Sequence, residues 1–151
     1  LLDELYNQNL YNEPIKAKIY AQHKLRLSEK IEDKNLTAFN LKVTGFKGGH
    51  SGVDIHLGRG NANKVFFRIL KEVNEKLGVR LADIQGGSLR NAIPREAFGV
   101  VVVKAKKADD LIVLVNELAE IAKVELGNVE PNISIVLEAA ELPKKLFSIS
   151  L

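Results

Sequence analysis

Two segments of the sequence carry apolar residues at helical spacing, and each lies between segments with the pattern of a β-strand. The first, residues 61–78, has a stripe that faces one side of a helix of 3.6 residues per turn, made of Val65, Phe66, Ile69, Leu70, Val73 and Leu77. Asn61 suits the N-cap of this helix, and Gly78 suits the position after its last turn. The spacing therefore predicts a helix bounded by these two residues.

The second helix is predicted over residues 109–126. Its first turn is acidic, which the helix dipole favours, and Gly127 closes it. Its predicted buried stripe consists of Leu111, Leu114, Val115, Leu118, Ile121 and Ala122.

Four strands are predicted around these helices. They are LTAFNLKVTGF (36–46), VRLADIQ (79–85), AFGVVVVK (97–104) and NISIVLEA (132–139). The third is continuously apolar, as expected for a strand at the centre of a sheet or covered on both faces. The order β-α-β-β-α-β predicts an α+β, ferredoxin-like two-layer sandwich, in which two helices cover one face of a four-stranded antiparallel sheet. The other face would be open to water or to a partner.

The rest of the chain is expected to flank this unit. Residues 1–35 form an N-terminal arm, in which helical spacing up to Pro14 is followed by an alternating stretch at 19–27 and a polar turn, SEKIEDKN. Residues 36–140 form the domain, and residues 141–151 form a tail. The chain contains no methionine, even at position 1, so we expect it to be a piece of a larger protein.

Composition excludes several classes of protein. No apolar run approaches the ~18 residues of a membrane span, and the leucines of the first segment are mixed with acids and amides, unlike a signal peptide. The absence of cysteine excludes disulfides and thiolate metal sites, and it fits a cytoplasmic protein. The net charge of +3 comes from scattered basic residues without an aromatic platform, which disfavours nucleic-acid binding.

The stretch GFKGGHSGVDIH (45–56) holds the strongest candidate for chemistry. His50 stands between a glycine pair and a Ser-Gly step. These glycines constrain the backbone of the loop more than an ordinary turn requires. Asp54 and His56 are close in sequence, but their spacing from His50 matches no helix-borne metal motif. GGHSG is also not the Gly-x-Ser-x-Gly elbow of a serine hydrolase. No complete active site is visible in the chain.

A second candidate is the stretch RNAIPRE (90–96). Arg90 and Asn91 could supply hydrogen-bond donors to a carboxylate or carbonyl oxygen. Equally, Asn and Pro could stand here for the backbone preferences of a turn between strands. Spacing alone does not separate these two interpretations.

Together, GFKGGHSGVDIHLGRGNANK and GGSLRNAIPREA resemble the lid, or dimerisation, domain of the zinc-dependent exopeptidases that include carnosinases and succinyl-diaminopimelate desuccinylase. The resemblance is strongest to the bacterial aminoacyl-histidine dipeptidases (Xaa-His dipeptidases, or peptidase D), and it covers roughly residues 36–140. The lid fold of that family agrees with the βαββαβ order predicted from the pattern.

The resemblance implies a division of labour. A separate catalytic domain of the same polypeptide would hold two zinc ions, and this chain, which lacks their ligands, would be inactive alone. The lid would pair with a second lid in a homodimer, and the substrate of the enzyme would be a dipeptide. His50 would then stabilise the oxyanion in the partner's active site, while Asn91, together with Arg90, would hold the substrate.

Two alternatives remain open at the level of sequence. One is a free-standing βαββαβ module that binds a ligand or nucleic acid on the open sheet face, for which Phe39 and Phe98 are the only strong aromatic candidates. The other is the lid of a related desuccinylase or tripeptidase.

Overall fold

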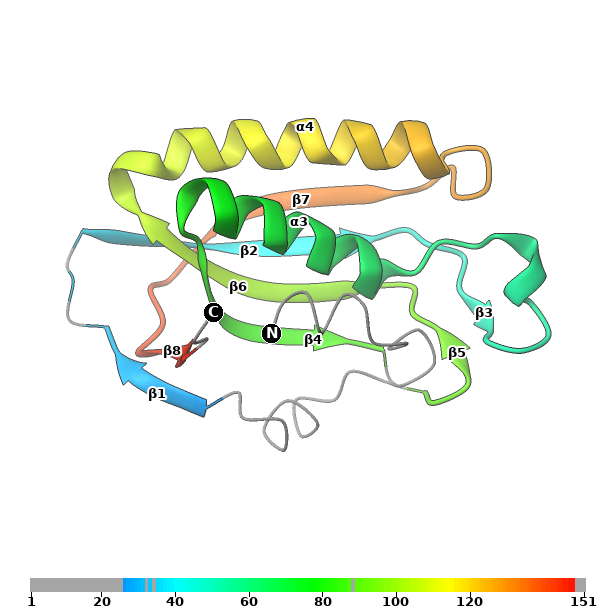
Figure 1. Ribbon diagram of the computed structural model, residues 1–151, viewed down its shortest axis with the longest axis horizontal. Coiled ribbons are helices and arrows are strands. Elements are labelled where there is room, and N and C mark those ends of the chain that lie inside the picture. The colour runs from blue at the N-terminus through cyan, green and yellow to red at the C-terminus, as the bar shows by residue number, and fades with distance from the viewer. Residues whose placement is uncertain (1–25, 32, 34, 88, 149–151) are drawn as a thin grey trace.

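The computed structural model describes residues 26–31, 33, 35–87 and 89–148, and its centre is a four-stranded antiparallel sheet (Figure 1). The strands lie in the order β4-β6-β2-β7. Their bounds are β2 Leu36–Thr44, β4 Arg80–Gly86, β6 Ala97–Lys104 and β7 Ser134–Ala140. Helices α3 (Ala62–Leu77) and α4 (Ala108–Leu126) lie on one face of this sheet. The predicted α+β sandwich and its βαββαβ order are confirmed.

Helix α3 has both of its predicted ends. The side chain of Asn61 accepts a hydrogen bond from the Lys64 amide at 3.1 Å, so it caps the first turn. Gly78 has φ of 71°, a left-handed conformation that favours glycine, and its amide donates to the Asn74 carbonyl at 2.8 Å. The predicted apolar stripe is buried as far as Val73, and Leu77 packs at its margin.

Helix α4 differs from its prediction at Ile121, whose residue surface is 49% exposed. The buried positions are Leu111, Val115, Ala119 and Ala122. Two more of the predicted stripe, Leu114 and Leu118, pack at the margin of the core. Ile121 lies about 100° around the helix from Ala122, so it turns away from the sheet, and the small Ala119 takes the inward position instead.

The core lies between the helices and the sheet. On β2 it takes Phe39, Leu41 and Val43, the alternate residues that the sequence predicts for one face. Strand β6 is central, between β4 and β2, which confirms the position inferred from its apolar run. Gly99 of this strand faces Phe66 of α3, and a β-carbon at Gly99 would stand 2.5 Å from the Phe66 ring. The missing side chain lets the helix pack closely on the sheet.

The opposite sheet face is covered at one end, where the sequence predicted that it would be open. Strands β1 (Arg26–Lys30) and β8 (Lys145–Ser148) pair antiparallel beneath the sheet (Figure 1). Leu146 of β8 is 2% exposed and packs on three residues of the sheet: Ala38, Ala82 and Val102. The predicted turn at 28–35 is therefore wrong for 28–30, because these polar residues belong to a strand whose partner is distant in sequence.

The short elements complete the description. Strands β3 (Gly49–His50) and β5 (Ala92–Ile93) form a small ribbon at the end of the molecule far from β1 and β8 (Figure 1). Two 3₁₀ turns span Ile55–Leu57 and Ala105–Lys107. Within the described ranges, no helix combines the length and apolar composition needed to cross a bilayer. The predictions for residues 1–25 lie outside the described residues.

Candidate functional site

The ribbon of β3 and β5 brings His50 and Asn91 together from two separate loops. Gly49 pairs with Ile93 and His50 with Ala92, and the Ser51 amide then donates to the Asn91 carbonyl at 2.9 Å. The pairing holds the two backbones in fixed register, so His50 and Asn91 lie side by side although they are far apart in sequence.

The ring of His50 is fixed by its own loop. Its Nδ1 accepts hydrogen bonds from the amides of Gly52 at 3.0 Å and Val53 at 3.2 Å. A ring nitrogen that accepts from N–H groups is unprotonated, so the neutral ring carries its hydrogen on Nε2. Nε2 lies 3.3 Å from Nδ2 of Asn91, at the exposed surface. This contact places the His50 ring and the Asn91 amide at one point of the surface.

Contacts inside the loop shape the approach to His50. The Asp54 carboxylate accepts from the His50 amide at 2.8 Å, and Arg59 donates to the Gly48 carbonyl at 2.6 Å. Arg59 also lies 3.5 Å from the Asp54 carboxylate. Gly49 has φ of 144°, and a β-carbon there would overlap both the Arg59 guanidinium and the Asp54 carboxylate. The second glycine of the GGHSG stretch is therefore required by close packing as well as by its backbone conformation.

The base of the loop is held by Glu130, which sequence reasoning missed. This residue follows α4 and is 1% exposed. Its Oε2 accepts from the Lys47 amide at 2.7 Å, and its Oε1 accepts from the Gly60 amide at 2.9 Å. One carboxylate thus binds the loop where it leaves β2 and where it returns to α3. The sequence gives no signal for this role, because Glu130 stands among the polar residues of an ordinary turn.

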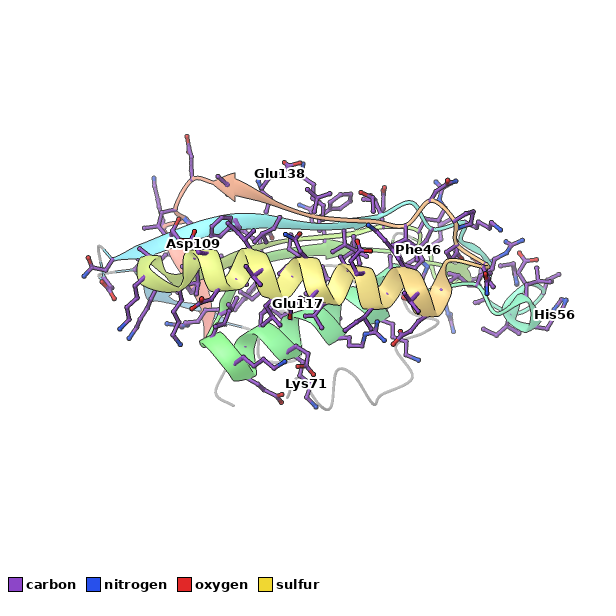
Figure 2. All side chains as sticks on the ribbon, turned by 90° about the horizontal axis from the view of Figure 1, so that it is seen from above. Phe46, His56, Lys71, Asp109, Glu117 and Glu138 are labelled. Atoms are coloured by element: carbon purple, nitrogen blue, oxygen red, sulfur yellow. The ribbon has the colours of Figure 1, made fainter. Side chains whose placement is uncertain are left out.

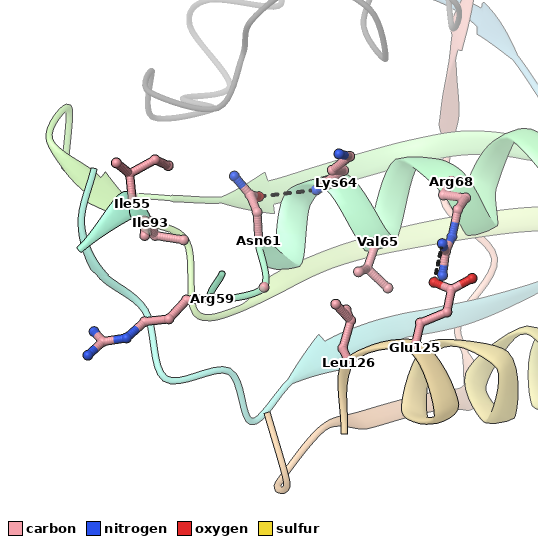
Figure 3. A pocket seen from close by; sticks show the side chains of 10 residues that line it. Ile55, Arg59, Asn61, Lys64, Val65, Arg68, Ile93, Glu125 and Leu126 are labelled. Carbon is pink, nitrogen blue, oxygen red and sulfur yellow. Dashed lines mark hydrogen bonds and ion pairs between the residues drawn. The ribbon is translucent and has the colours of Figure 1, made fainter. Parts of the chain in front are cut away.

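A cavity of about 310 Å³ lies beside the base, between the start of α3 and the end of α4 (Figure 3). Arg68 is paired there with Glu125 at 2.6 Å, and the Asn61 oxygen is occupied by the Lys64 amide. Arg59 binds the loop backbone, as described above. These polar groups already form contacts within the chain, so the cavity gives no evident site for a ligand.

The remaining candidates from the sequence are spread out. Arg90 is exposed beside Asn91. His56 lies on the Ile55–Leu57 turn at the outer end of the loop, well away from Phe46 at its base (Figure 2). No three His, Cys, Asp or Glu side chains converge to hold a metal ion among the residues that the structure describes. The residues present therefore do not fit a zinc site.

The two aromatic candidates for an open-face binding site lie on opposite faces. Phe39 is 8% exposed and belongs to the core beneath the helices. Phe98 is half-buried on the other face, where it lines a shallow groove of about 250 Å³ with polar neighbours such as Lys42 and Asp83. A single aromatic ring gives that groove little capacity for stacking.

Comparison with known families decides what kind of domain this is. Residues 31–130, more than half of the chain, match the family described as "Peptidase dimerisation domain". The chain belongs to this family. The dimerisation domain is 47% identical over 115 residues to the cytosol non-specific dipeptidase of Escherichia coli K12, covering 76% of this chain and 24% of that protein. It thus spans about a quarter of the length of this curated relative.

Solved structures agree with the sequence match. The dimerisation domain superposes on aminoacylhistidine dipeptidase from Vibrio alginolyticus with a TM-score of 0.76 and 44% identity, over 80% of this chain and 24% of that one. A hydantoinase/carbamoylase family amidase from Burkholderia multivorans gives a TM-score of 0.52 at 17% identity, over 74% of this chain and 28% of that one. The second likeness shows the fold alone. The resemblance to dipeptidase lids is confirmed.

Proposed function

We propose that this dimerisation domain is the lid of a metal-dependent dipeptidase that hydrolyses Xaa-His dipeptides, and that His50 stabilises the oxyanion of the reaction. The names of the Escherichia coli and Vibrio relatives support a dipeptidase over a desuccinylase, a tripeptidase or a free-standing binding module. The Vibrio relative carries the aminoacylhistidine name, which favours a substrate such as β-alanyl-histidine.

The observation that carries this proposal is the state of the His50 ring. Because Gly52 and Val53 donate to Nδ1, the neutral imidazole carries its hydrogen on Nε2, and the loop holds the ring in place before the reaction begins. When water adds to a peptide carbonyl, negative charge develops on the carbonyl oxygen. A donor aimed at that oxygen binds the transition state more tightly than the substrate and raises kcat.

Asn91 and Arg90 would supply the binding half of the site. The Asn91 amide stands 3.3 Å from Nε2 and can donate to the same oxygen or to the substrate backbone. Arg90, one residue earlier, is exposed and of the right charge to attract the carboxylate of a dipeptide. Both residues come from the loop between β4 and β6, so the ribbon sets their distance from His50.

Two zinc ions are proposed for the catalytic domain of the full-length protein and none for this domain. The described residues hold no metal cluster, so no step of the chemistry is assigned to a metal in this domain. The proposal therefore includes that the chain is inactive by itself and that its catalytic domain lies elsewhere in the polypeptide. A cytoplasmic location is proposed from the name of the E. coli relative.

A homodimer through this domain is also proposed. Strand β7 is at the edge of the sheet, and its outer side meets no other strand in the part of the chain that the structure describes. Helix α4 carries exposed apolar side chains, among them Val113 at 57% and Val124 at 83%. An unpaired strand edge and exposed apolar side chains on the neighbouring helix suit a second copy of the chain.

The test is His50→Ala in the full-length protein, with β-alanyl-histidine as substrate. We expect kcat to fall by about a hundredfold or more, because an oxyanion donor is lost. Bound zinc, measured on the same samples, should be unchanged. His56→Ala is the control, since His56 is an exposed histidine of the same loop. Full turnover by His50→Ala would show that the loop serves folding or dimer contact only.

A further inference from the structure

We infer that Glu130 is a positioning residue for His50: its buried carboxylate sets the place of the catalytic loop by binding both of its ends. This inference rests on the function proposed above for His50. Glu130 lies on the turn between α4 and β7, in the second half of the fold, and the loop lies in the first half. Its contact therefore joins parts of the chain that local sequence does not connect.

The contacts of Glu130 are specific to the loop. Its two oxygens accept from Lys47 at 2.7 Å and from Gly60 at 2.9 Å, and both donors are backbone amides. Each of its oxygens thus has a donor, as a carboxylate that is 1% exposed requires. Hydrogen bonds to a charged acceptor are stronger than those between neutral groups. The two ends of the 47–60 segment are thereby held at one point.

The other side of the base is closed by different residues. The Phe46 amide donates to the Arg95 carbonyl at 3.4 Å, and the Ala62 amide donates to the Pro94 carbonyl at 3.1 Å. A β-carbon at Gly60 would overlap the Phe46 ring, so the backbone is packed without spare room. The segment that follows Asn91 and β5 therefore contacts the same base that Glu130 holds. Loss of either Glu130 bond would let the loop shift relative to Asn91.

Such a shift matters because catalysis depends on sub-ångström placement of a donor. Misplacement of a catalytic group by about 1 Å can lower the rate by about a hundredfold. Glu130 does not touch the substrate in this scheme. Its influence passes through the loop backbone to the His50 ring, so its effect on kcat should vanish when His50 is absent.

The experiment is a double-mutant cycle in the full-length enzyme with β-alanyl-histidine as substrate. Glu130→Gln keeps the shape of the side chain but places an NH₂ group against one of the two amides. We expect kcat to fall by about tenfold, with KM and bound zinc unchanged. In the His50→Ala background, Glu130→Gln should cost nothing further. Glu72→Gln, a half-buried carboxylate of α3 that pairs with Lys76 and lies outside the loop, is the matched control.

A second measurement tests the loop independently of activity. In the 151-residue chain, hydrogen exchange at the Lys47 and Gly60 amides should become faster in Glu130→Gln, whereas exchange at Ile69 in the core of α3 should not change. Retained protection at Ile69 shows that the variant is folded. Glu130→Asp, which keeps the charge but is shorter by one methylene, should lower kcat in the same His50-dependent way.

The outcomes separate this inference from the function on which it rests. If Glu130→Gln lowers kcat equally with and without His50, the residue acts on the whole fold and the inference is wrong. If His50→Ala lowers kcat and Glu130→Gln does not, only the inference fails. If His50→Ala has no effect on turnover, the proposed function fails and the positioning role fails with it.

Discussion

The polar side chains in the interior of this chain differ in whether they form a hydrogen bond with a backbone group. Glu130 and Asn74 are satisfied: the first accepts from two amides, and the second donates to the Val79 carbonyl at 2.7 Å. Asn63 is 5% exposed, and neither of its side-chain polar atoms has a hydrogen-bond partner in the structure as described. A buried amide without partners costs free energy that its neighbours must offset.

The contrast gives a prediction for stability. Replacing Asn63 by Leu keeps the branched shape and removes the unpaired polar atoms, so the free energy of unfolding should rise by about 1–3 kcal/mol. Denaturant unfolding of the 151-residue chain measures the change. Asn74→Leu, on the same helix, should lower stability because it removes a hydrogen bond. Equal signs for the two variants would contradict this account.

Single residues also show how far sequence reasoning reaches. The sequence predicts His50 as a candidate because the glycines beside it constrain the loop more than an ordinary turn requires, and a β-carbon at Gly49 would overlap Arg59 and Asp54. Asn91 and Arg90 were left undecided, because the ribbon that places Asn91 beside His50 joins residues distant in sequence. Glu130 could not be found, since its partners are backbone amides, which every residue except proline carries.

For helices and strands, the sequence pattern predicts correctly those features that depend on residues within the same element. The ends of α3 were predicted because Asn61 and Gly78 act on their own helix. The misplacement of Ile121 has a different origin. The residues of α4 that are buried depend on how the helix is placed over the sheet, and the spacing of apolar residues within the helix does not determine this placement. The second part of β1, residues 28–30, is predicted as a turn for the same reason, because the partner of this strand is the distant β8.

Close packing of α3 on β6 leads to a prediction at this scale. Gly99→Ala should lower the free energy of unfolding by about 1–3 kcal/mol, because the new β-carbon would stand 2.5 Å from the Phe66 ring and 2.8 Å from the Asp83 carbonyl oxygen. Adding Phe66→Leu should recover part of the loss, as expected for two residues in contact. Thermal unfolding of the chain measures both changes.

Gly52→Ala is the control for this pair. A β-carbon at Gly52 would meet its nearest atoms, those of the His50 ring, at an ordinary 3.4 Å. Its effect on stability should therefore be small. An equal loss in Gly99→Ala and Gly52→Ala would indicate a general cost of replacing glycine rather than a clash between helix and sheet.

For the whole molecule, the proposed homodimer gives the most direct prediction. Val113 and Val124 are exposed and lie about three turns apart on the same side of α4. Changing both to Asp would place charges in an apolar contact, so the full-length protein should become monomeric. Light scattering during size exclusion measures the mass. Leu142→Asp, another exposed apolar position, should leave the dimer intact.

The pairing of β1 with β8 has a mechanical consequence. Arg26 lies opposite Ser148 and Lys30 opposite Lys145, so Arg26 and Ser148 stand side by side at the outer end of this ladder. A force that pulls these two residues apart would break the hydrogen-bonded pairs of the ladder one after another instead of all together. Beyond Lys30 and Lys145, the pull would reach β2 and β7 close to the pairing of Ala38 with Ala140, and peeling would continue there. Under such a force the paired residues would therefore separate one after another. Separation would begin at the end of the molecule far from the ribbon that carries His50, so this ribbon would be disturbed last.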